Sequence, residues 1–101
     1  MQLKVEFLGL ARELAGTKEG LVQVGEQATW REVVRQLAAE YPALLGTVII
    51  PDHDACDSDM QHYKLAPSYM FNVGGRAMVR DLDMPVQAEE RLLLMFAEAG
   101  G

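Results

Sequence analysis

Two stretches of this sequence contain residues whose types could support chemistry. The segment between Pro51 and Tyr63 is rich in aspartates and also contains His53, Cys56 and His62. The sequence ends on Gly100-Gly101, two residues that have no side chains. The first stretch raises the question of a metal or thiol site. The second raises the question of a reactive main-chain carboxylate.

The acidic segment does not have the spacing that a metal site needs. It has a single cysteine, and its two histidines are nine positions apart, whereas zinc sites space paired ligands by two to five residues. The glycine and the terminal glutamate of a calcium-binding loop are also missing. The neighbouring carboxylates disfavour the thiolate form that a catalytic Cys56 would require. We therefore interpret this segment as an exposed, solvated loop with neither a metal nor a catalytic thiol.

The terminal glycines offer a different chemistry. A glycine carboxylate is unhindered, and a backbone without Cβ atoms can thread a channel too narrow for other residues. The glycines follow Ala97, the last residue of an apolar run, by only a few positions. We expect an extended tail at residues 98–101, in which Gly101 supplies the reacting carboxylate and Gly100 lets the tail enter a partner protein.

Composition and charge narrow the class of protein. The 101 residues suit one domain, 1–101, and half of them are hydrophobic. A formal net charge of -6 argues against binding to nucleic acid or to an anionic membrane surface. The start of the sequence has no signal-peptide pattern, and no apolar run approaches the roughly 20 residues that span a bilayer. With one cysteine and no internal disulfide, a cytoplasmic protein is expected.

The N-terminal part predicts two strands. In QLKVEFL, apolar and polar residues alternate, which predicts a strand with Leu3, Val5 and Phe7 in the core. A glycine-containing loop with one helical turn follows. A second short strand, LVQV, is expected to pair antiparallel with the first, and its register is open because Leu21 and Val24 do not alternate.

The main helix has clear boundaries in the sequence. Thr29 and Glu32 have the spacing of a capping box, which predicts a helix start. Pro42 predicts the end of the helix at Tyr41, and a further turn can include Leu44 and Leu45. An apolar stripe at helical spacing lies between these limits, made of Trp30, Val33, Val34, Leu37, Ala38 and Tyr41.

The C-terminal half predicts a loop insertion and more strands. Residues 47–68 form a long polar segment in which TVII is a candidate short strand. Gly74-Gly75 lies between two apolar runs and predicts a tight hairpin. RLLLMFA, residues 91–97, predicts the last strand. The order of elements predicts an α+β fold, a mixed sheet of four to five strands with one main helix packed on one face.

These stretches together resemble the MoaD/ThiS family of ubiquitin-like sulfur carriers, whose fold is the β-grasp. VEFLGLARELAG is similar to the first strand and Phe-x-x-x-x-Arg-Glu loop of the family, with Phe7, Arg12 and Glu13 on the pattern. TWREVVRQLAAEYPAL resembles the family helix, and FNVGGRAM resembles its hairpin, with Gly74 where asparagine is usual. Phe96-Ala97 stand where molybdopterin-synthase small subunits often have Pro-Pro.

The resemblance implies a carrier subunit that is not an enzyme by itself and binds no cofactor. An E1-like adenylyltransferase of the MoeB/ThiF type would use ATP to adenylate the Gly101 carboxylate, and sulfur transfer would then give a C-terminal thiocarboxylate. The favoured acceptor is the molybdopterin synthase large subunit, of the MoaE type, in molybdenum- or tungsten-cofactor synthesis. Three alternatives stay open: a sulfur carrier of another pathway (thiamine thiazole, tRNA thiolation or cysteine), a ubiquitin-like protein modifier, and a plain β-grasp interaction domain.

The last strand also carries a prediction about partner binding. By the family alignment, Leu92 and Leu94 face the core, and Leu93 and Met95 face outward beside the tail. Because a sheet covered by one helix has one core face, apolar residues on the second face indicate an interface or a covering loop. The expected partner-binding residues are Leu93, Met95, Phe96, Ala97, Glu98 and Ala99.

Overall fold

The computed structural model describes residues 1–52, 62–75, 77–79, 81–86 and 91–96. Its elements, in chain order, are β1 (Gln2–Phe7), α1 (Leu10–Ala15), β2 (Glu19–Gln23), α2 (Trp30–Glu40), the 3-10 helix η1 (Pro42–Leu44), β3 (Ile49–Pro51), β4 (Tyr63–Leu65), β5 (Tyr69–Val73), β6 (Ala77–Met78) and β7 (Leu92–Phe96).

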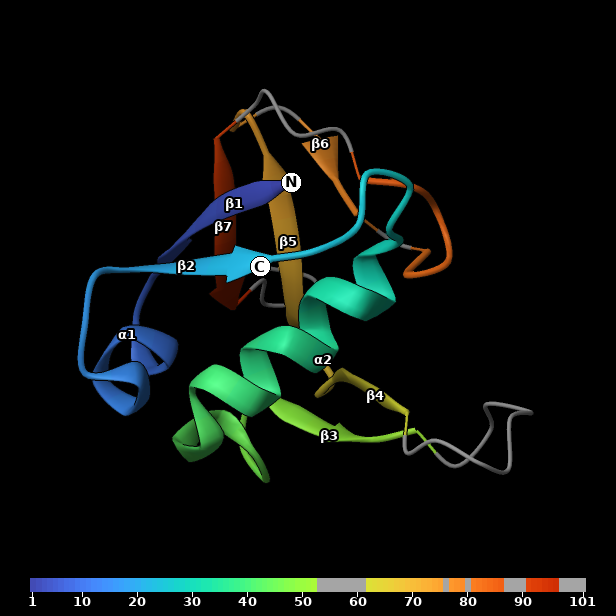
Figure 1. The fold of residues 1–101 in the computed structure, drawn as a ribbon. Coiled ribbons are helices and arrows are strands. Elements are labelled where there is room, and N and C mark those ends of the chain that lie inside the picture. Colours follow the sequence, from blue (N-terminus) through green and yellow to red (C-terminus); the bar gives the residue numbers. More distant parts are fainter. Residues whose placement is uncertain (53–61, 76, 80, 87–90, 97–101) are drawn as a thin grey trace.

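Five of the strands form one mixed sheet in the order β2-β1-β7-β5-β6. The first and last strands, β1 and β7, are parallel neighbours at its centre, and the other three pairings are antiparallel. The helix α2 lies across one face of this sheet (Figure 1). The predicted α+β class, with a mixed sheet and one main helix on one face, is confirmed, and the arrangement is a β-grasp.

The core lies between α2 and the sheet. The stripe predicted on the helix is buried from Trp30 to Ala38, and Tyr41 is half-buried at its end. On β1, Leu3, Val5 and Phe7 are buried as the alternation predicted. Trp30 stacks on Phe71 of β5 with ring centroids 5.1 Å apart. The periods of 3.6 and 2 therefore bring the two apolar faces together, as the sequence indicated.

The start of α2 differs from the expected capping box. Thr29 is the N-cap residue, but its side chain makes no cap hydrogen bond, and the Glu32 carboxylate pairs with Arg35. The segment 81–86 supplies acceptors instead: the N–H groups of Trp30 and Arg31 donate to the carbonyls of Met84 and Leu82, at 3.1 and 2.8 Å. A tertiary contact thus satisfies two of the four N–H groups that the first turn of a helix leaves without an intrahelical acceptor.

The register of β2 is settled by its pairing with β1. Val22 lies opposite Leu3 and is buried, whereas Leu21 lies opposite Lys4 and is 55% exposed. The antiparallel pairing that the sequence predicted is confirmed. At Gly20, a Cβ atom would lie 2.5 Å from the Tyr41 hydroxyl, so a larger residue there would require the Tyr41 ring to move.

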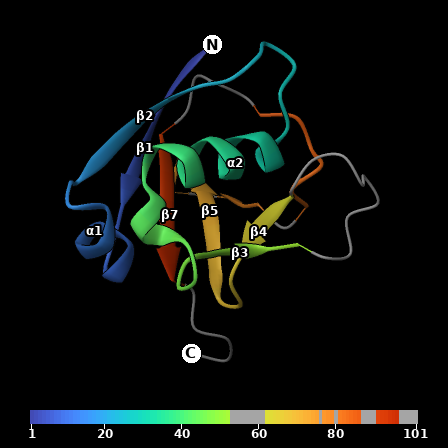
Figure 2. The ribbon, with the colours of Figure 1, turned by 60° about the horizontal axis from the view of Figure 1, so that its bottom comes forward.

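The segment 47–68 holds more structure than a loop insertion. β3 and β4 pair antiparallel in a separate two-stranded sheet, and β4 packs against α2. This pair lies on the side of the helix away from β2 (Figure 2). The Asp52 N–H donates to the His62 carbonyl at 2.8 Å. The expected exposed loop between them, with His53 and Cys56, lies outside the described residues.

The hairpin between β5 and β6 forms where the glycine pair predicted it. Gly74 and Gly75 have φ angles of 64° and 73°, which residues with a Cβ rarely adopt. The turn places Met78 opposite Asn72. The 3-10 helix η1 supplies the further turn expected after Pro42, with Leu44 buried in it.

We expect Leu94→Ala to lower the free energy of unfolding by about 2–5 kcal/mol, because Leu94 is fully buried at the centre of the sheet. Leu21→Ala is the matched control, since Leu21 is 55% exposed, and it should change stability by less than about 0.5 kcal/mol. Urea unfolding followed by the fluorescence of the only tryptophan, Trp30, measures both. Equal losses in the two variants would contradict the assignment of the core face.

Candidate functional site

The candidate site is built on β7, the strand that precedes the terminal residues. Ala97, Glu98, Ala99, Gly100 and Gly101 lie outside the described residues, so their predicted roles stay predictions. β7 is bonded to β1 on one side and to β5 on the other, between which it lies in Figure 2. The Leu8 N–H extends the β1 side by donating to the Leu94 carbonyl at 3.2 Å. The strand that leads into the tail is thus hydrogen-bonded on both sides at the centre of the sheet.

The two faces of β7 differ in burial. Leu92 and Leu94 are 1% and 0% exposed and belong to the same core cluster as Val33. Leu93 and Met95 are only half-buried, and strand alternation places them on the face opposite α2. The predicted inward and outward positions are therefore confirmed. The binding role of the outward pair stays a prediction.

Cross-strand neighbours extend this outer apolar surface. Met70 of β5 lies directly opposite Met95, and Leu8 follows the end of β1 beside the end of β7. Leu8 is 40% exposed. We call Leu8, Met70, Leu93 and Met95 the tail-side patch, because it borders the end of β7. The sequence analysis missed Leu8 and Met70, since only the strand register shows that they adjoin Met95.

Phe96 is exposed although alternation places it on the core face with Leu94. Its side chain is 53% exposed and meets Tyr69 edge-on, with ring centroids 5.2 Å apart. Alternation gives the face of a residue but does not show where the covering helix stops. Phe96 therefore adds an accessible aromatic ring next to the tail.

Charged pairs occupy the outer face beyond the tail-side patch. Arg91 forms a bidentate ion pair with Glu6, and its hydrogen bond holds the pKa of the Glu6 carboxyl below its usual value. Lys4 pairs with Glu19 at 3.1 Å. Exposed pairs of this kind contribute little to stability. Because Glu6 lies beside Leu93, these ion pairs border the tail-side patch on its β1 side.

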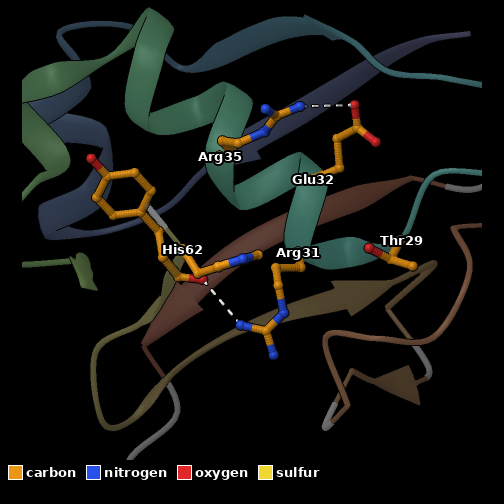
Figure 3. Close-up of a pocket in the computed structure, with 6 residues that line it drawn as sticks. Thr29, Arg31, Glu32, Arg35 and His62 are labelled. Atoms are coloured by element: carbon orange, nitrogen blue, oxygen red, sulfur yellow. Dashed lines mark hydrogen bonds and ion pairs between the residues drawn. The ribbon is translucent and has the colours of Figure 1, made fainter. Parts of the chain in front are cut away.

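Apart from the tail-side patch, a hollow of about 180 Å³ lies beside α2. It is lined by Arg31, Arg35 and His62 among others (Figure 3). Its arginines are already paired: Arg35 with Glu32 at 3.2 Å, and Arg31 with Asp52 at 2.7 Å and with Asp83 at 2.9 Å. Because both arginines are already in ion pairs, we interpret this hollow as part of a structural contact between elements and not as a binding site. Arg31 joins the start of α2, the residue after β3 and the segment 81–86.

Within the described ranges, no three histidine, cysteine, aspartate or glutamate residues lie close enough to hold a metal ion. In the same part of the chain, no helix is long and apolar enough to cross a membrane.

Comparison with solved structures identifies proteins of the same fold. The small archaeal modifier protein 1 of Haloferax volcanii matches with a TM-score of 0.72 at 21% identity, over 100% of both chains. That of Methanosarcina acetivorans matches at 0.68 and 23% identity, over 99% of this chain and 96% of the other. A Pyrococcus furiosus protein, provisionally described as molybdopterin converting factor subunit 1, matches at 0.64 and 18%, over 97% and 99%.

No protein-family model and no curated protein matches the sequence. The structural matches agree with the resemblance to the MoaD/ThiS carriers at the level of the fold. At these identities they leave the chemistry of the terminal residues to experiment.

We expect Arg31→Gln to lower the free energy of unfolding at pH 7 by roughly 1–3 kcal/mol, because Asp52, whose side chain is 10% exposed, loses its charged donor. The hydrogen bond from Arg31 holds the pKa of Asp83 below its usual value. The stabilisation by the Arg31–Asp83 pair is therefore present above the pKa of an unfolded aspartate, about 4. It is lost as the pH falls through the lower pKa that Asp83 has in the folded protein.

Urea unfolding at pH 7 and at about pH 3 tests this linkage. The difference between Arg31→Gln and the parent protein should shrink at the lower pH. Arg35→Gln is the control, because its partner Glu32 lies on the helix surface, and it should cost less than about 0.5 kcal/mol. A difference that is the same at both pH values would rule out the ion pairs as its cause.

Proposed function

We propose that this protein is a ubiquitin-like sulfur carrier that acts in molybdopterin synthesis. An E1-like adenylyltransferase of the MoeB/ThiF type activates the Gly101 carboxylate with ATP. A sulfur donor then converts the acyl adenylate to a thiocarboxylate. A molybdopterin synthase large subunit of the MoaE type receives the sulfur.

The observation that carries the proposal is that Gly100-Gly101 follow β7, a central strand, within a few positions in the sequence. Phe96 ends β7, and the five residues after it can extend by at most about 17 Å. A β-grasp body with such a tail can dock on an enzyme and present its last carboxylate inside a narrow active site. The fold shared with the Pyrococcus protein supports this use.

The chemistry explains why a carrier needs no catalytic side chain of its own. A free carboxylate is a poor acyl donor because its leaving group would be an oxide. Attack of the carboxylate on the α-phosphate of ATP releases pyrophosphate and makes AMP the leaving group. A sulfur nucleophile can then displace AMP at the Gly101 carbonyl. The carrier contributes an unhindered carbonyl and a body that fixes its position.

A second candidate function uses the same activated end. The Haloferax and Methanosarcina proteins that share this fold are named as modifier proteins. Attack on the acyl adenylate, or on a thioester derived from it, by a lysine amine would join Gly101 to another protein through an amide bond. Sulfur carriers of other pathways share the adenylation step and differ only in the acceptor.

The tail-side patch is proposed to dock on the partner enzymes. Apolar residues that lie on the uncovered face of a sheet and border the reacting end meet the requirements of an interface core. Phe96 can supply an aromatic anchor beside them, since it is already half exposed.

We expect deletion of Gly101 to abolish adenylation, because the reacting carboxylate moves one residue closer to the body, and Gly100→Val to impair it, because a β-branched side chain blocks a narrow channel. Folding should be unchanged in both. ATP–pyrophosphate exchange with an E1-like adenylyltransferase from the same organism measures the activation. Full activation of the deletion variant would refute the carrier proposal.

Intact-mass analysis separates the two candidate functions. The mass gain of oxygen replaced by sulfur on the free protein supports the carrier. Conjugates that survive a denaturing gel and disappear in the deletion variant support the modifier. The mass of protein isolated from its own cells also tests whether the mature chain ends at Gly101.

We expect Met95→Glu to weaken binding to the activating or acceptor enzyme by about tenfold or more, more than 1 kcal/mol, with a small change in urea midpoint. A charge at the centre of an apolar interface loses its water without gaining a partner. Leu21→Glu is the control, because Leu21 is exposed on the far strand β2. If Met95→Glu unfolds the protein instead, this face is covered within the chain and is not an interface.

A further inference from the structure

A separate apolar pocket of about 290 Å³ lies at the opposite end of the sheet from the tail-side patch. Its floor includes Trp30 of α2 and Val73 of β5, and its walls include Ala77 of β6 together with Asp81 and Met84. Val73 pairs with Leu92, the first residue of β7, whereas the tail follows the last residue of that strand. The pocket also lies on the helix side of the sheet. No part of the proposed carrier chemistry uses it.

The pocket is held open by the segment that forms its wall. The Val86 N–H donates to the Ala28 carbonyl at 2.9 Å, and the Met84 carbonyl accepts from the Trp30 N–H at 3.1 Å. Arg31 reinforces this wall through its ion pair with Asp83 at 2.9 Å. The contacts fix the segment 81–86 against the helix start and leave Met84 55% exposed at the rim. A preformed pocket of this kind binds without first paying for a rearrangement.

Two features define what the pocket would accept. Its lining is apolar apart from one carboxylate, Asp81, whose Oδ1 accepts from the Asp83 N–H at 2.9 Å. Among the residues that the structure describes, no cation forms an ion pair with Asp81, and the whole chain carries a net charge of -6. A ligand that combines an apolar group with a positive charge complements both features.

We propose that this pocket docks a linear segment of a partner protein in which one large apolar side chain is flanked by arginine or lysine. The apolar side chain contacts Trp30, Val73 and Met84, and the flanking cation lies over Asp81. The exposed methionine suits such an anchor, since its thioether adapts to different shapes.

This docking site goes beyond the proposed carrier function and is independent of it. The tail-side patch and the pocket occupy opposite faces and opposite ends of the sheet, so both can be bound at once. The partner at the pocket would then select where or when the carrier works. The chemistry at Gly101 would not require it.

The test uses the full chain and four capped pentapeptides. Two contain a central leucine or phenylalanine flanked by arginines and glycines, and two have glutamates in place of the arginines. Trp30 is the only tryptophan and lines the pocket, so its fluorescence reports binding there directly. We expect at least one arginine peptide to give a saturable change below about 5 mM and to bind at least about fivefold more tightly than its glutamate counterpart.

Variants locate the binding. Ala77→Leu should remove it by filling the pocket, and Asp81→Asn should weaken it roughly threefold to fivefold by removing the charge. Glu13→Gln removes an exposed carboxylate from α1 and is the matched control, with no change expected. Deletion of Gly101 should also leave peptide binding unchanged, which separates this proposal from the carrier proposal.

Three results would overturn the proposal. Equal binding of arginine and glutamate peptides would remove the role of Asp81, and no saturable change with any peptide would remove the docking site. Self-association of the free chain that Ala77→Leu abolishes would mean that a second copy occupies the pocket. Because Asp81→Asn alters only a surface charge, it keeps the test valid even if Ala77→Leu does not fold.

Discussion

The fold depends on the parallel pairing of the first strand with the last. Val5 to Phe7 of β1 lie beside Leu92 to Leu94 of β7, so nearly the whole chain is enclosed between two neighbouring strands. Closing so long a loop costs conformational entropy, and burial of Phe7 and Leu94 at the same contact offsets it. The strand before the tail is thereby fixed at the centre of the sheet, whereas an edge strand could fray.

A central strand in a sheet covered on one side should be polar on the other. β7 departs from this rule at Leu93 and Met95, and β5 departs from it at Met70, the residue opposite Met95. On the same face, Glu6 and Lys4 of β1 follow the rule and form ion pairs, whereas Leu21 of β2, opposite Lys4, is a further exposed apolar residue. A core requirement explains none of Leu93, Met95 and Met70, and their position beside the end of β7 supports the interface that we propose there.

Much of the fold could be predicted from local patterns. The alternation in β1, the stripe on α2 and the glycine pair before β6 each depend on neighbours a few residues apart, and each prediction was confirmed. The capping box at Thr29 was wrong: the Thr29 side chain makes no cap hydrogen bond, and the Glu32 N–H donates to the Thr29 carbonyl. The N–H groups of Trp30 and Arg31 bond instead to carbonyls more than fifty positions away. β4 was missed because its three residues, Tyr63–Leu65, are too few for their alternation to stand out, and because its partners, β3 and α2, lie far away in the sequence.

The residues of the candidate site also divide into those that local patterns predicted and those that only long-range contacts reveal. Leu93 and Met95 could be assigned to the outer face from period two alone, but Leu8 and Met70 required the register. Phe96 shows the limit of alternation, which predicts the face of the sheet on which a side chain lies but not whether that side chain is buried.

The contact between the segment 81–86 and the start of α2 also forms the apolar pocket beside Trp30. Because the carbonyls of Leu82 and Met84 serve the N–H groups at the start of α2, the segment 81–86 stands against the helix and does not fall across Val73. One face of the molecule is then left with a hollow over Trp30, and the other with an apolar surface beside the tail. A small rigid domain can in this way meet two partners without competition between them. The sheet that carries the tail also keeps their two sites apart, because they lie on its opposite faces.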